Sequence, residues 1–535
     1  MPISQAQVEK QRSAFRVSNR ETWLVVVATV AFSLFYFLDI YLRSSEKYFW
    51  YDELFTSFLC KMSFPSLWTA VKAGADQNPP LFYLLTKAST AILGHGRLAT
   101  RLPEITGFWI FCLCLFRFVT RRAGVVVGFV VMFFPVFTGA FYYAYEARPH
   151  GIVLGFCGLA LVCWQMMIEH RERNTWNVAF SLCLLGAFLT HCYAITLTVP
   201  FGVAQMVESI RSRHVRWKGW LAIALPASIA CLTYIPLLRS AHLMGDGSQV
   251  LAIAPHNWSR VLAFYVFLLS PSLLLLITAL ALGTVVKFLE NRAERPEGRD
   301  ESELRILEFV LAAAFLALPV FGVILAKLVN TNVVSRYFLS ALAGVCILLG
   351  FFLQSAKRMH WATCTLACIM AMTALGSVSL VFRHRRHGVL EPLADPSSNF
   401  TMNASLTGPM GRYSWLLSHV RPGEPIFLPW EADVVYFSNY APDVAPRTYY
   451  IQWNETDVFG RFLRTLQHWY PVHYNVARPD EFFHSTPEFA VIGPDWATFT
   501  LGRFIRAGGT ITSFDVGDDR FVAQVRMNAG QAPAQ

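Results

Sequence analysis

The sequence predicts a polytopic α-helical membrane protein, and two observations support this prediction. Of the 535 residues, 54% are hydrophobic and only 15% are charged, whereas soluble proteins carry roughly a quarter charged residues. Runs of about 20 apolar residues, each long enough to cross a bilayer as a helix, recur before position 382. These features exclude a disordered chain, a collagen-like fibre and an ordinary cytosolic enzyme.

The apolar runs predict about eleven membrane-spanning helices. Basic residues precede the first run and no A-x-A cleavage site follows it, which is typical of a retained helix rather than a removed signal peptide. The expected spans are 23–42, 104–120, 124–142, 151–168, 175–190, 193–209, 219–238, 262–288, 306–328, 337–353 and 361–382.

The net charge of +10 indicates orientation rather than nucleic-acid binding. Most basic residues lie in short clusters between apolar runs, on the same side as the N-terminus, which the positive-inside rule puts in the cytoplasm. An odd number of spans then puts the C-terminal tail outside, although the arginines at 383–386 disagree with this topology. Arginine outnumbers lysine by 36 to nine, a bias typical of GC-rich bacteria, so we expect a bacterial inner (plasma) membrane.

The chain is expected to divide into three regions. Residues 1–22 form a cytoplasmic N-terminus, residues 23–389 a membrane unit with a long outer loop at 43–103, and residues 390–535 a small extracytoplasmic α/β domain. In the tail, EFAVIGP and RFVAQVRM have the composition of strands, whereas DVFGRFLRTLQHWY has the pattern of an amphipathic helix. The tail contains no cysteine, no GxGxxG and no P-loop motif.

The outer loop at 43–103 contains two notable features. Its apolar segment PPLFYLLTKASTAIL is too short to span and is expected to lie along the interface or re-enter, with Asp76 or Asn78 as the helix cap. Asp52 and Glu53 lie about ten residues after the first expected helix, in the aromatic segment FWYDELFTSF. A solvated acidic pair is the ordinary alternative, but carboxylates beside a bilayer are costly and are therefore functional candidates.

Two further outer segments carry candidates. Glu146 and Arg148 lie in FYYAYEARPHG, where an interfacial ion pair is the structural alternative. Arg336 and Tyr337 open a late helix, where a snorkelling arginine beside an interfacial tyrosine is the alternative. Against it, arginine is suited to binding phosphate through two parallel hydrogen bonds. No histidine or cysteine spacing predicts a metal site, and His191 is expected to be a buried, satisfied histidine.

Taken in order, these segments resemble a known pattern. The pattern comprises a DE pair after the first helix, PPLxYxL in the same loop, RLP opening the second helix, EAR in the second outer loop and RY opening a late helix. Residues 20–350 thereby resemble the GT-C integral-membrane glycosyltransferases, specifically the clan of protein O-mannosyltransferases and aminoarabinose transferases (glycosyltransferase family 39-like). The sequence departs from that pattern in DQNPP, which lacks a basic residue before the prolines, and in RYFLSALAG, which lacks a proline.

The resemblance implies roles for individual residues. Asp52 would be the catalytic base, Glu53 its partner acid and Glu146 the second-loop acid. Arg336 would bind the donor phosphate, with Arg148 and Tyr337 as further candidates for that role. Asp76 and Asn78 are candidates for the acceptor side of the loop.

The predicted reaction moves a sugar, hexose or pentose, from a polyprenyl-phosphate donor to a hydroxyl of an extracytoplasmic glycan, lipid or protein. Nucleotide sugars are not expected outside the cytoplasm, so the donor must already have been carried across. Asp52 would deprotonate the acceptor, an arginine would stabilise the leaving phosphate, and direct displacement would invert the anomeric carbon. No cofactor is predicted, and the sequence leaves a divalent cation open without indicating one.

Two other functions compete with a transferase. A membrane transporter or flippase would also use intramembrane charges, but such proteins tend to show inverted repeats and charges near the midplane. A non-catalytic membrane scaffold with an outer binding domain would depend on residues 390–535 rather than on Asp52 or Arg336.

Overall fold

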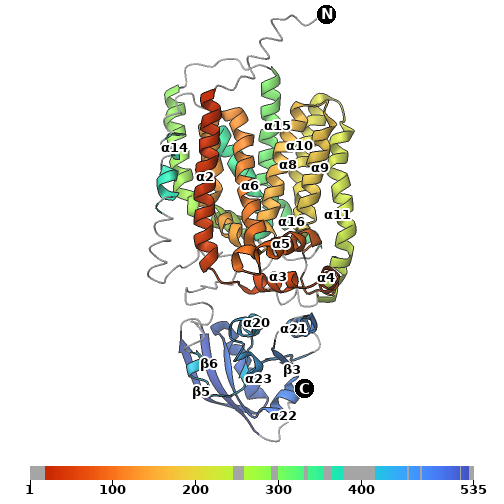
Figure 1. The fold of residues 1–535 in the computed structure, drawn as a ribbon, viewed down its shortest axis with the longest axis vertical. Helices are drawn as coiled ribbons and strands as arrows, with labels where there is room; N and C mark the ends of the chain where they lie inside the picture. The colour runs from red at the N-terminus through yellow and green to blue at the C-terminus, as the bar shows by residue number, and fades with distance from the viewer. Residues whose placement is uncertain are drawn as a thin grey trace, which may run out of the picture.

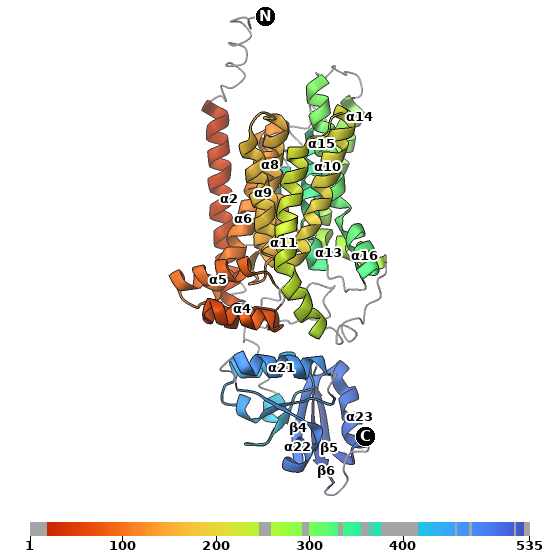
Figure 2. The same cartoon turned by 90° about the vertical axis from the view of Figure 1, so that its right-hand side faces the viewer.

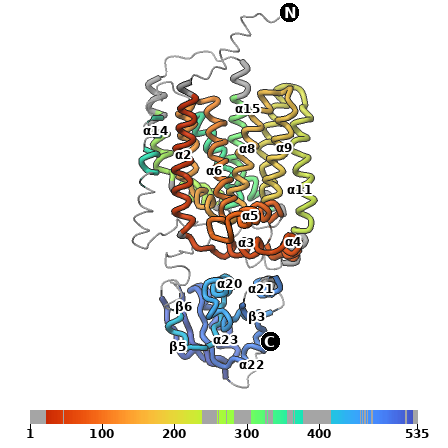
Figure 3. Tube along the Cα trace, viewed as in Figure 1, coloured from red at the N-terminus to blue at the C-terminus, as the bar shows by residue number. Residues whose placement is uncertain are grey.

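A bundle of long helices and a smaller α/β unit make up the protein (Figure 1). The computed structural model describes residues 19–76, 78–244, 258–290, 299–329, 335–354, parts of 363–376, 416–454, 457–469, 473–517 and 520–528. The chain enters at α2, runs through the bundle, and ends in the α/β unit (Figure 3).

The helices of the bundle lie roughly parallel, with α6 near the centre, packed against α2, α7, α8 and α17 (Figures 1 and 2). The long and regular elements are α2 (Asn19–Glu46), α6 (Arg97–Ala123), α7 (Val125–Phe133), α8 (His150–Glu169), α9 (Asn174–Phe188), α10 (Thr198–Ser212), α11 (Trp217–Met244), α13 (Ser259–Leu269), α14 (Leu273–Glu290), α15 (Arg299–Leu316), α16 (Leu318–Val329) and α17 (Ala341–Gln354). Short 3-10 helices connect them: η1 (Phe134–Phe137), η2 (Gly139–Tyr145), η3 (Cys192–Leu197), η5 (Ser270–Ser272) and η6 (Ser335–Phe338).

The described helices are those of an integral membrane protein. Four of them are long and apolar enough to cross a bilayer, and the number rises to seven if each of three bent pairs is one span. The expected span at 361–382 lies largely outside the described residues.

Three of the expected spans are not single straight helices, because the chain bends within them. The span at 124–142 bends by 75° between η1 and η2, that at 262–288 by 84° between α13 and α14, and that at 306–328 by 47° between α15 and α16. Pro135, Pro271 and Pro319 lie in the first turns after or beside these breaks. Proline lacks the N–H that would continue the preceding helix, which favours a break or a new helical segment at these positions.

The second helix also begins earlier than predicted, at Arg97 rather than at 104, with Pro103 inside it. Hydropathy excluded the polar first turns, but Arg101 in those turns is completely buried. The buried carboxylate of Glu53 pairs with this charge. Because the charge is paired, the helix can include a segment whose composition is too polar for a typical membrane span.

Three helices of the 43–103 loop lie across one end of the bundle: α3 (Tyr51–Lys61), α4 (Phe64–Lys72) and α5 (Pro80–Leu93) (Figures 1 and 2). The expectation that Asp76 or Asn78 caps α5 is wrong. Pro79 is the residue before the first turn and no side chain caps it. Pro80 at the first position needs no cap for its missing N–H, and Asp76 is paired elsewhere.

The α/β unit lies beyond α3 and α4 and contains a six-stranded sheet of order β3-β2-β1-β4-β6-β5. Strands β1 (Ile426–Phe427), β2 (Thr448–Ile451), β3 (Asn475–Ala477) and β4 (Glu488–Pro494) are parallel, whereas β5 (Gly509–Gly517) and β6 (Arg520–Met527) form an antiparallel hairpin. The helical elements are α20 (Glu431–Tyr440), η7 (Ala445–Arg447), α21 (Val458–Trp469), α22 (Pro479–Ser485), η8 (Asp495–Thr498) and α23 (Phe499–Arg506). Helices α20 and α21 lie on the side facing the bundle (Figure 1).

The α6–α8 contact is unusually close because glycines line it. A Cβ on Gly107 would lie 2.4 Å from the carbonyl oxygen of Gly151, and one on Gly155 would lie 2.7 Å from the carbonyl oxygen of Gly107. Small residues allow helix backbones to touch in this way inside membranes. The contact fixes the start of α8, and with it the preceding Glu146–Arg148 segment, against α6.

Gly107→Ala is expected to destabilise the protein by about 1–3 kcal/mol, because the added methyl forces two backbones apart. Gly202→Ala is the matched control, since a Cβ there meets nothing within 4 Å. Unfolding in detergent, followed by circular dichroism, measures both. Equal stability of the two variants would contradict the close contact.

Candidate active site at the end of the bundle

Asp52 and Glu53 occupy the first turn of α3 but point to different surroundings. The helix begins at Tyr51 after Trp50, whose backbone N–H donates to Glu53 Oε2 at 3.3 Å. Successive residues of an α-helix are about 100° apart around its axis. Glu53 therefore faces the interior and is fully buried, whereas Asp52 keeps 17% of its side chain exposed.

Glu53 forms a buried two-point ion pair with Arg101 of α6. Arg101 Nε donates to Oε1 at 2.7 Å and Nη2 to Oε2 at 2.8 Å, and the Ala147 N–H donates to Oε1 at 2.7 Å. Burial alone would raise the pKa of Glu53, but Arg101 and Lys47 hold it below its ordinary value. The carboxylate is thus ionised and saturated, which indicates an anchoring role. Its predicted role as a partner acid in catalysis stays a prediction.

Arg101 also holds the backbone that leads into the site. Its Nη1 donates to the carbonyl oxygens of Ser44 and Lys47 at 2.8 Å each, and its Nη2 to that of Tyr48 at 3.1 Å. Five donors in one planar group satisfy three carbonyls and one carboxylate. Arg101 therefore ties the end of α2, the segment after it and the start of α3 to α6.

Asp52 lies between two arginines from distant parts of the chain. Its Oδ2 is 3.3 Å from Nη2 of Arg336 and 3.7 Å from Nε of Arg148. Arg148 also binds Asp76, through Nη1 at 2.8 Å and Nη2 at 3.3 Å. The amide of Asn78 donates to both carboxylate oxygens of Asp76 at 3.3 Å. Five of the predicted residues therefore form one connected network.

Glu146 lies beside this network with Lys47 as its partner. Lys47 Nζ is 3.5 Å from Oε1, and it also lies 4.0 Å from the ring centroid of Tyr142. Oε2 is buried and has no hydrogen-bond partner among the described residues. Burial raises the pKa of Glu146 to about 7, although Lys47 opposes the shift.

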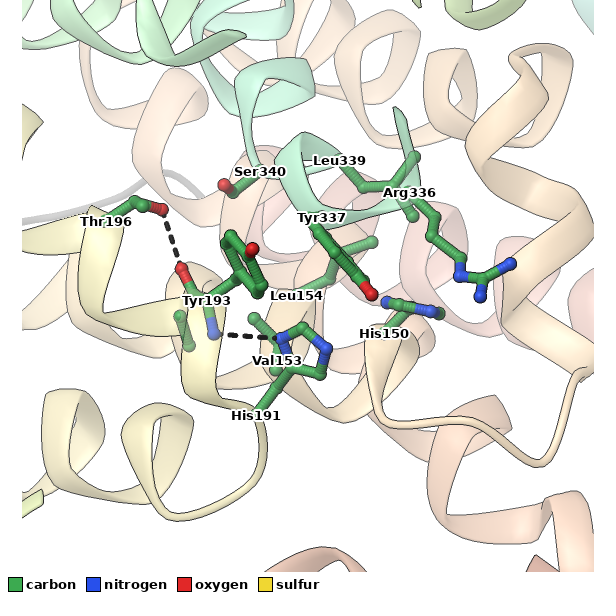
Figure 4. Close-up of a pocket in the computed structure, with 11 residues that line it drawn as sticks. His150, Val153, Leu154, His191, Tyr193, Thr196, Arg336, Tyr337, Leu339 and Ser340 are labelled. Carbon is green, nitrogen blue, oxygen red and sulfur yellow. Dashed lines mark hydrogen bonds between the residues drawn. The ribbon is translucent and has the colours of Figure 1, made fainter. Parts of the chain in front are cut away.

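Arg336 and Tyr337 border a small cavity between α8, η3 and η6 (Figure 4). The lining includes His150, His191, Tyr193 and Ser340. The Tyr193 and Tyr337 rings stack with centroids 4.2 Å apart. In addition, the guanidinium carbon of Arg336 lies 5.6 Å from the centroid of the Trp50 ring. Arg336 and Tyr337 therefore each lie against an aromatic ring, Trp50 and Tyr193 respectively.

His191 is buried, and its Nδ1 is hydrogen-bonded. Its Nδ1 accepts from the Tyr193 N–H at 3.2 Å. Burial, with Arg148 and Arg336 nearby, lowers its pKa to about 3, so the ring stays neutral. With Nδ1 occupied as an acceptor, Nε2 carries the proton.

Four residues of the site were not expected from the sequence to have site roles: Lys47, Trp50, Arg101 and His150. Arg101 was used only as part of the RLP segment, and Lys47 only as one basic residue among many. The one signal available was their placement: all four lie in or next to an outer segment that carries a predicted residue. No group of three or more histidine, cysteine, aspartate or glutamate residues suited to a metal occurs in the described part of the chain.

Comparisons with known proteins place this architecture in a class. The chain has the fold of the GT-C integral-membrane glycosyltransferases, as the resemblance predicted. Over 97% of its length and 100% of the other chain, it matches the crystal structure of ArnT from Cupriavidus metallidurans in the apo state, with a TM-score of 0.52 and 13% identity. The crystal structure of the same ArnT bound to undecaprenyl phosphate matches with a TM-score of 0.51 and 14% identity, over 95% of this chain and 99% of that one. No family model matches the sequence, and no curated protein matches it significantly.

Arg101→Gln is expected to cost about 3–5 kcal/mol of stability, because it leaves the buried Glu53 charge without its partner. The same change at Arg526, whose pair with Glu488 is exposed, should cost under about 1 kcal/mol. Unfolding of Arg101→Gln, Glu53→Gln and the double variant measures the coupling. If the double variant lost the sum of the two single losses, the pair would contribute nothing as a pair.

The pKa of Glu146 predicts a pH effect on stability. The carboxyl binds a proton more tightly in the folded protein, at about 7, than at its ordinary value of 4.5. Its contribution to the free energy of unfolding is therefore full at low pH and declines as the pH rises from about 4.5 to 7. Thermal unfolding of Glu146→Gln should show a smaller decline than the wild type over that window. Parallel curves would contradict the raised pKa.

Proposed function

We propose that the protein is a membrane glycosyltransferase that moves a sugar from a polyprenyl-phosphate donor to a hydroxyl of an extracytoplasmic acceptor. The observation that carries the proposal is the placement of Asp52 between Arg336 and Arg148, at one end of a GT-C bundle. A carboxylate next to two guanidinium groups provides both a proton acceptor and a site for an anionic leaving group.

In the proposed reaction, Asp52 takes the proton from the acceptor hydroxyl. The acceptor oxygen forms a bond to the anomeric carbon while the bond from that carbon to the phosphate oxygen breaks, with its electron pair passing to the phosphate. The configuration at the anomeric carbon inverts. Arg336 stabilises the released phosphate, whose low basicity makes charge stabilisation more important than protonation.

The pairing of Asp52 with Arg336 suggests an order of events. Arg336 Nη2 contacts Oδ2 of Asp52. A donor phosphate competes for the same guanidinium, since arginine binds phosphate with two parallel hydrogen bonds. Binding of the donor thereby releases the Asp52 oxygen that must accept the proton, while Arg148 keeps the carboxylate oriented.

The choice of a lipid-linked donor rests on the fold and on the position of the site. Undecaprenyl phosphate is the ligand in one of the matched ArnT structures, and the cavity beside Arg336 lies between α8, η3 and η6 of the helical bundle. A polyprenyl chain would lie between those helices with its phosphate at the end of the bundle. The sugar is a hexose or a pentose, and the acceptor is a glycan, a lipid or a protein. Mass spectrometry of a deletion strain distinguishes these possibilities.

The proposed topology has the N-terminus in the cytoplasm, about eleven spans in a bacterial inner membrane, and the α/β unit outside. Its support is the arrangement of basic residues: those at or just after the C-terminal ends of α6, α8 and α10 lie at the opposite end of the bundle from α3, α4 and the α/β unit. Acids partly neutralise them, as when Arg121 and Arg122 pair with Glu169.

A deletion strain tests the proposed reaction and identifies both substrates in one experiment. Mass spectrometry of its lipids, glycans and proteins should show one sugar missing from an acceptor and a lipid-linked sugar accumulating. The wild-type gene should restore the modification, whereas Asp52→Asn should lower transfer by at least about 100-fold, the contribution of a general base. Asp443→Asn removes an exposed carboxylate of the α/β unit as a control. Full restoration by Asp52→Asn would refute the mechanism.

A further inference from the structure

Helix α20 of the α/β unit contacts the backbone immediately before Asp52. The Tyr51 N–H donates to the hydroxyl oxygen of Tyr436 at 2.6 Å, and the Tyr440 hydroxyl donates to the carbonyl oxygen of Phe49 at 2.9 Å. These two backbone groups lie on either side of Trp50, whose ring is next to Arg336.

The contact belongs to a continuous apolar core rather than to a loose surface. Leu54 and Phe55 of α3 share one buried cluster with Tyr436 and Phe437 of α20. The rings of Tyr48 and Tyr440 also touch, with centroids 5.6 Å apart. The α/β unit and the loop helices therefore bury a common core, which restricts their relative movement.

Arg101 binds the same segment. It holds the carbonyl oxygens of Ser44, Lys47 and Tyr48, while α20 holds Phe49 and Tyr51. Both backbone contacts of α20 are made by tyrosine hydroxyls. The ring of Tyr436 is buried and that of Tyr440 is half-buried. The segment 44–51 is thus restrained both by α6 and by the α/β unit.

We infer that Tyr436 and Tyr440 are positioning residues for Asp52, so that the α/β unit is part of the active-site framework. The inference rests on the proposed function and assigns a role to the C-terminal domain that the resemblance did not provide. Neither tyrosine touches the reacting atoms. Their hydroxyls fix the backbone from which Asp52 projects, and a shift of about 1 Å at a reacting group is enough to slow a reaction by a large factor.

The double variant Tyr436→Phe/Tyr440→Phe tests the inference, because it removes two hydroxyls and keeps both rings in the shared core. In the full-length protein, amide hydrogen exchange in a peptide covering 49–55 is expected to become about fivefold faster, the effect of one ordinary hydrogen bond. The kcat of transfer is expected to fall about tenfold, with KM for donor and acceptor within about twofold of the wild type.

Tyr474→Phe is the matched control. The Tyr474 hydroxyl donates to the carbonyl oxygen of Leu463 at 2.9 Å, so this hydrogen bond stays within the α/β unit. It should leave both the 49–55 exchange and kcat unchanged, which separates positioning from a general loss of domain stability. Size-exclusion chromatography and thermal unfolding of all variants confirm that they are folded.

The outcomes separate this inference from the proposed function. Unchanged exchange at 49–55 in the double variant would overturn the inference, and so would faster exchange with an unchanged kcat. A tenfold loss of kcat in Tyr474→Phe would also overturn it. If the wild-type protein showed no transfer at all, the proposed function would fail, and the exchange measurement alone would decide whether α20 restrains the segment.

Discussion

The buried ion pair between Glu53 and Arg101 is the interaction on which the rest of the site depends. Removing two charges from water is costly, and the cost is offset only when nearly every donor and acceptor is satisfied. Here Arg101 reaches two carboxylate oxygens and three backbone carbonyls, and Glu53 also accepts from Ala147. The pair thereby joins α3, the segment before it, α6 and the turn before α8 at a single point.

This anchoring explains how two adjacent acids take different roles. Glu53 directs its charge to the interior, whereas Asp52, one position earlier on the helix, faces the arginines of two other segments. Asp76 has an orienting role like that of Glu53, although it is slightly less buried. Its ion pair with Arg148 keeps that arginine beside Asp52. The network is therefore oriented by neighbours that are themselves held, which is the arrangement expected for a preorganised site.

Much of the site was predictable because hydropathy identifies which end of each helix a polar residue occupies. Asp52 and Arg336 are 284 residues apart in the chain, yet they were expected on one surface and are in contact. Hydropathy cannot predict that a charged residue is buried when a partner of opposite charge is buried beside it. The hydropathy span therefore began at 104 and left out Arg101, although Arg101 belongs to α6. The bends beside Pro135 and Pro271, and the docking of α20, depend in the same way on tertiary packing that a window of composition does not contain.

The contact between Tyr51 and Tyr436 joins residues that are 385 positions apart. At ribosomal speeds of about 5–20 residues per second, roughly 20–80 seconds pass between synthesis of the first and of the second. During that interval the first loop has Arg101 to hold it, but not α20. A nascent chain, or one truncated before α20, consequently lacks the two hydrogen bonds from Tyr436 and Tyr440, and the order of synthesis itself delays assembly of the complete site until α20 has been made.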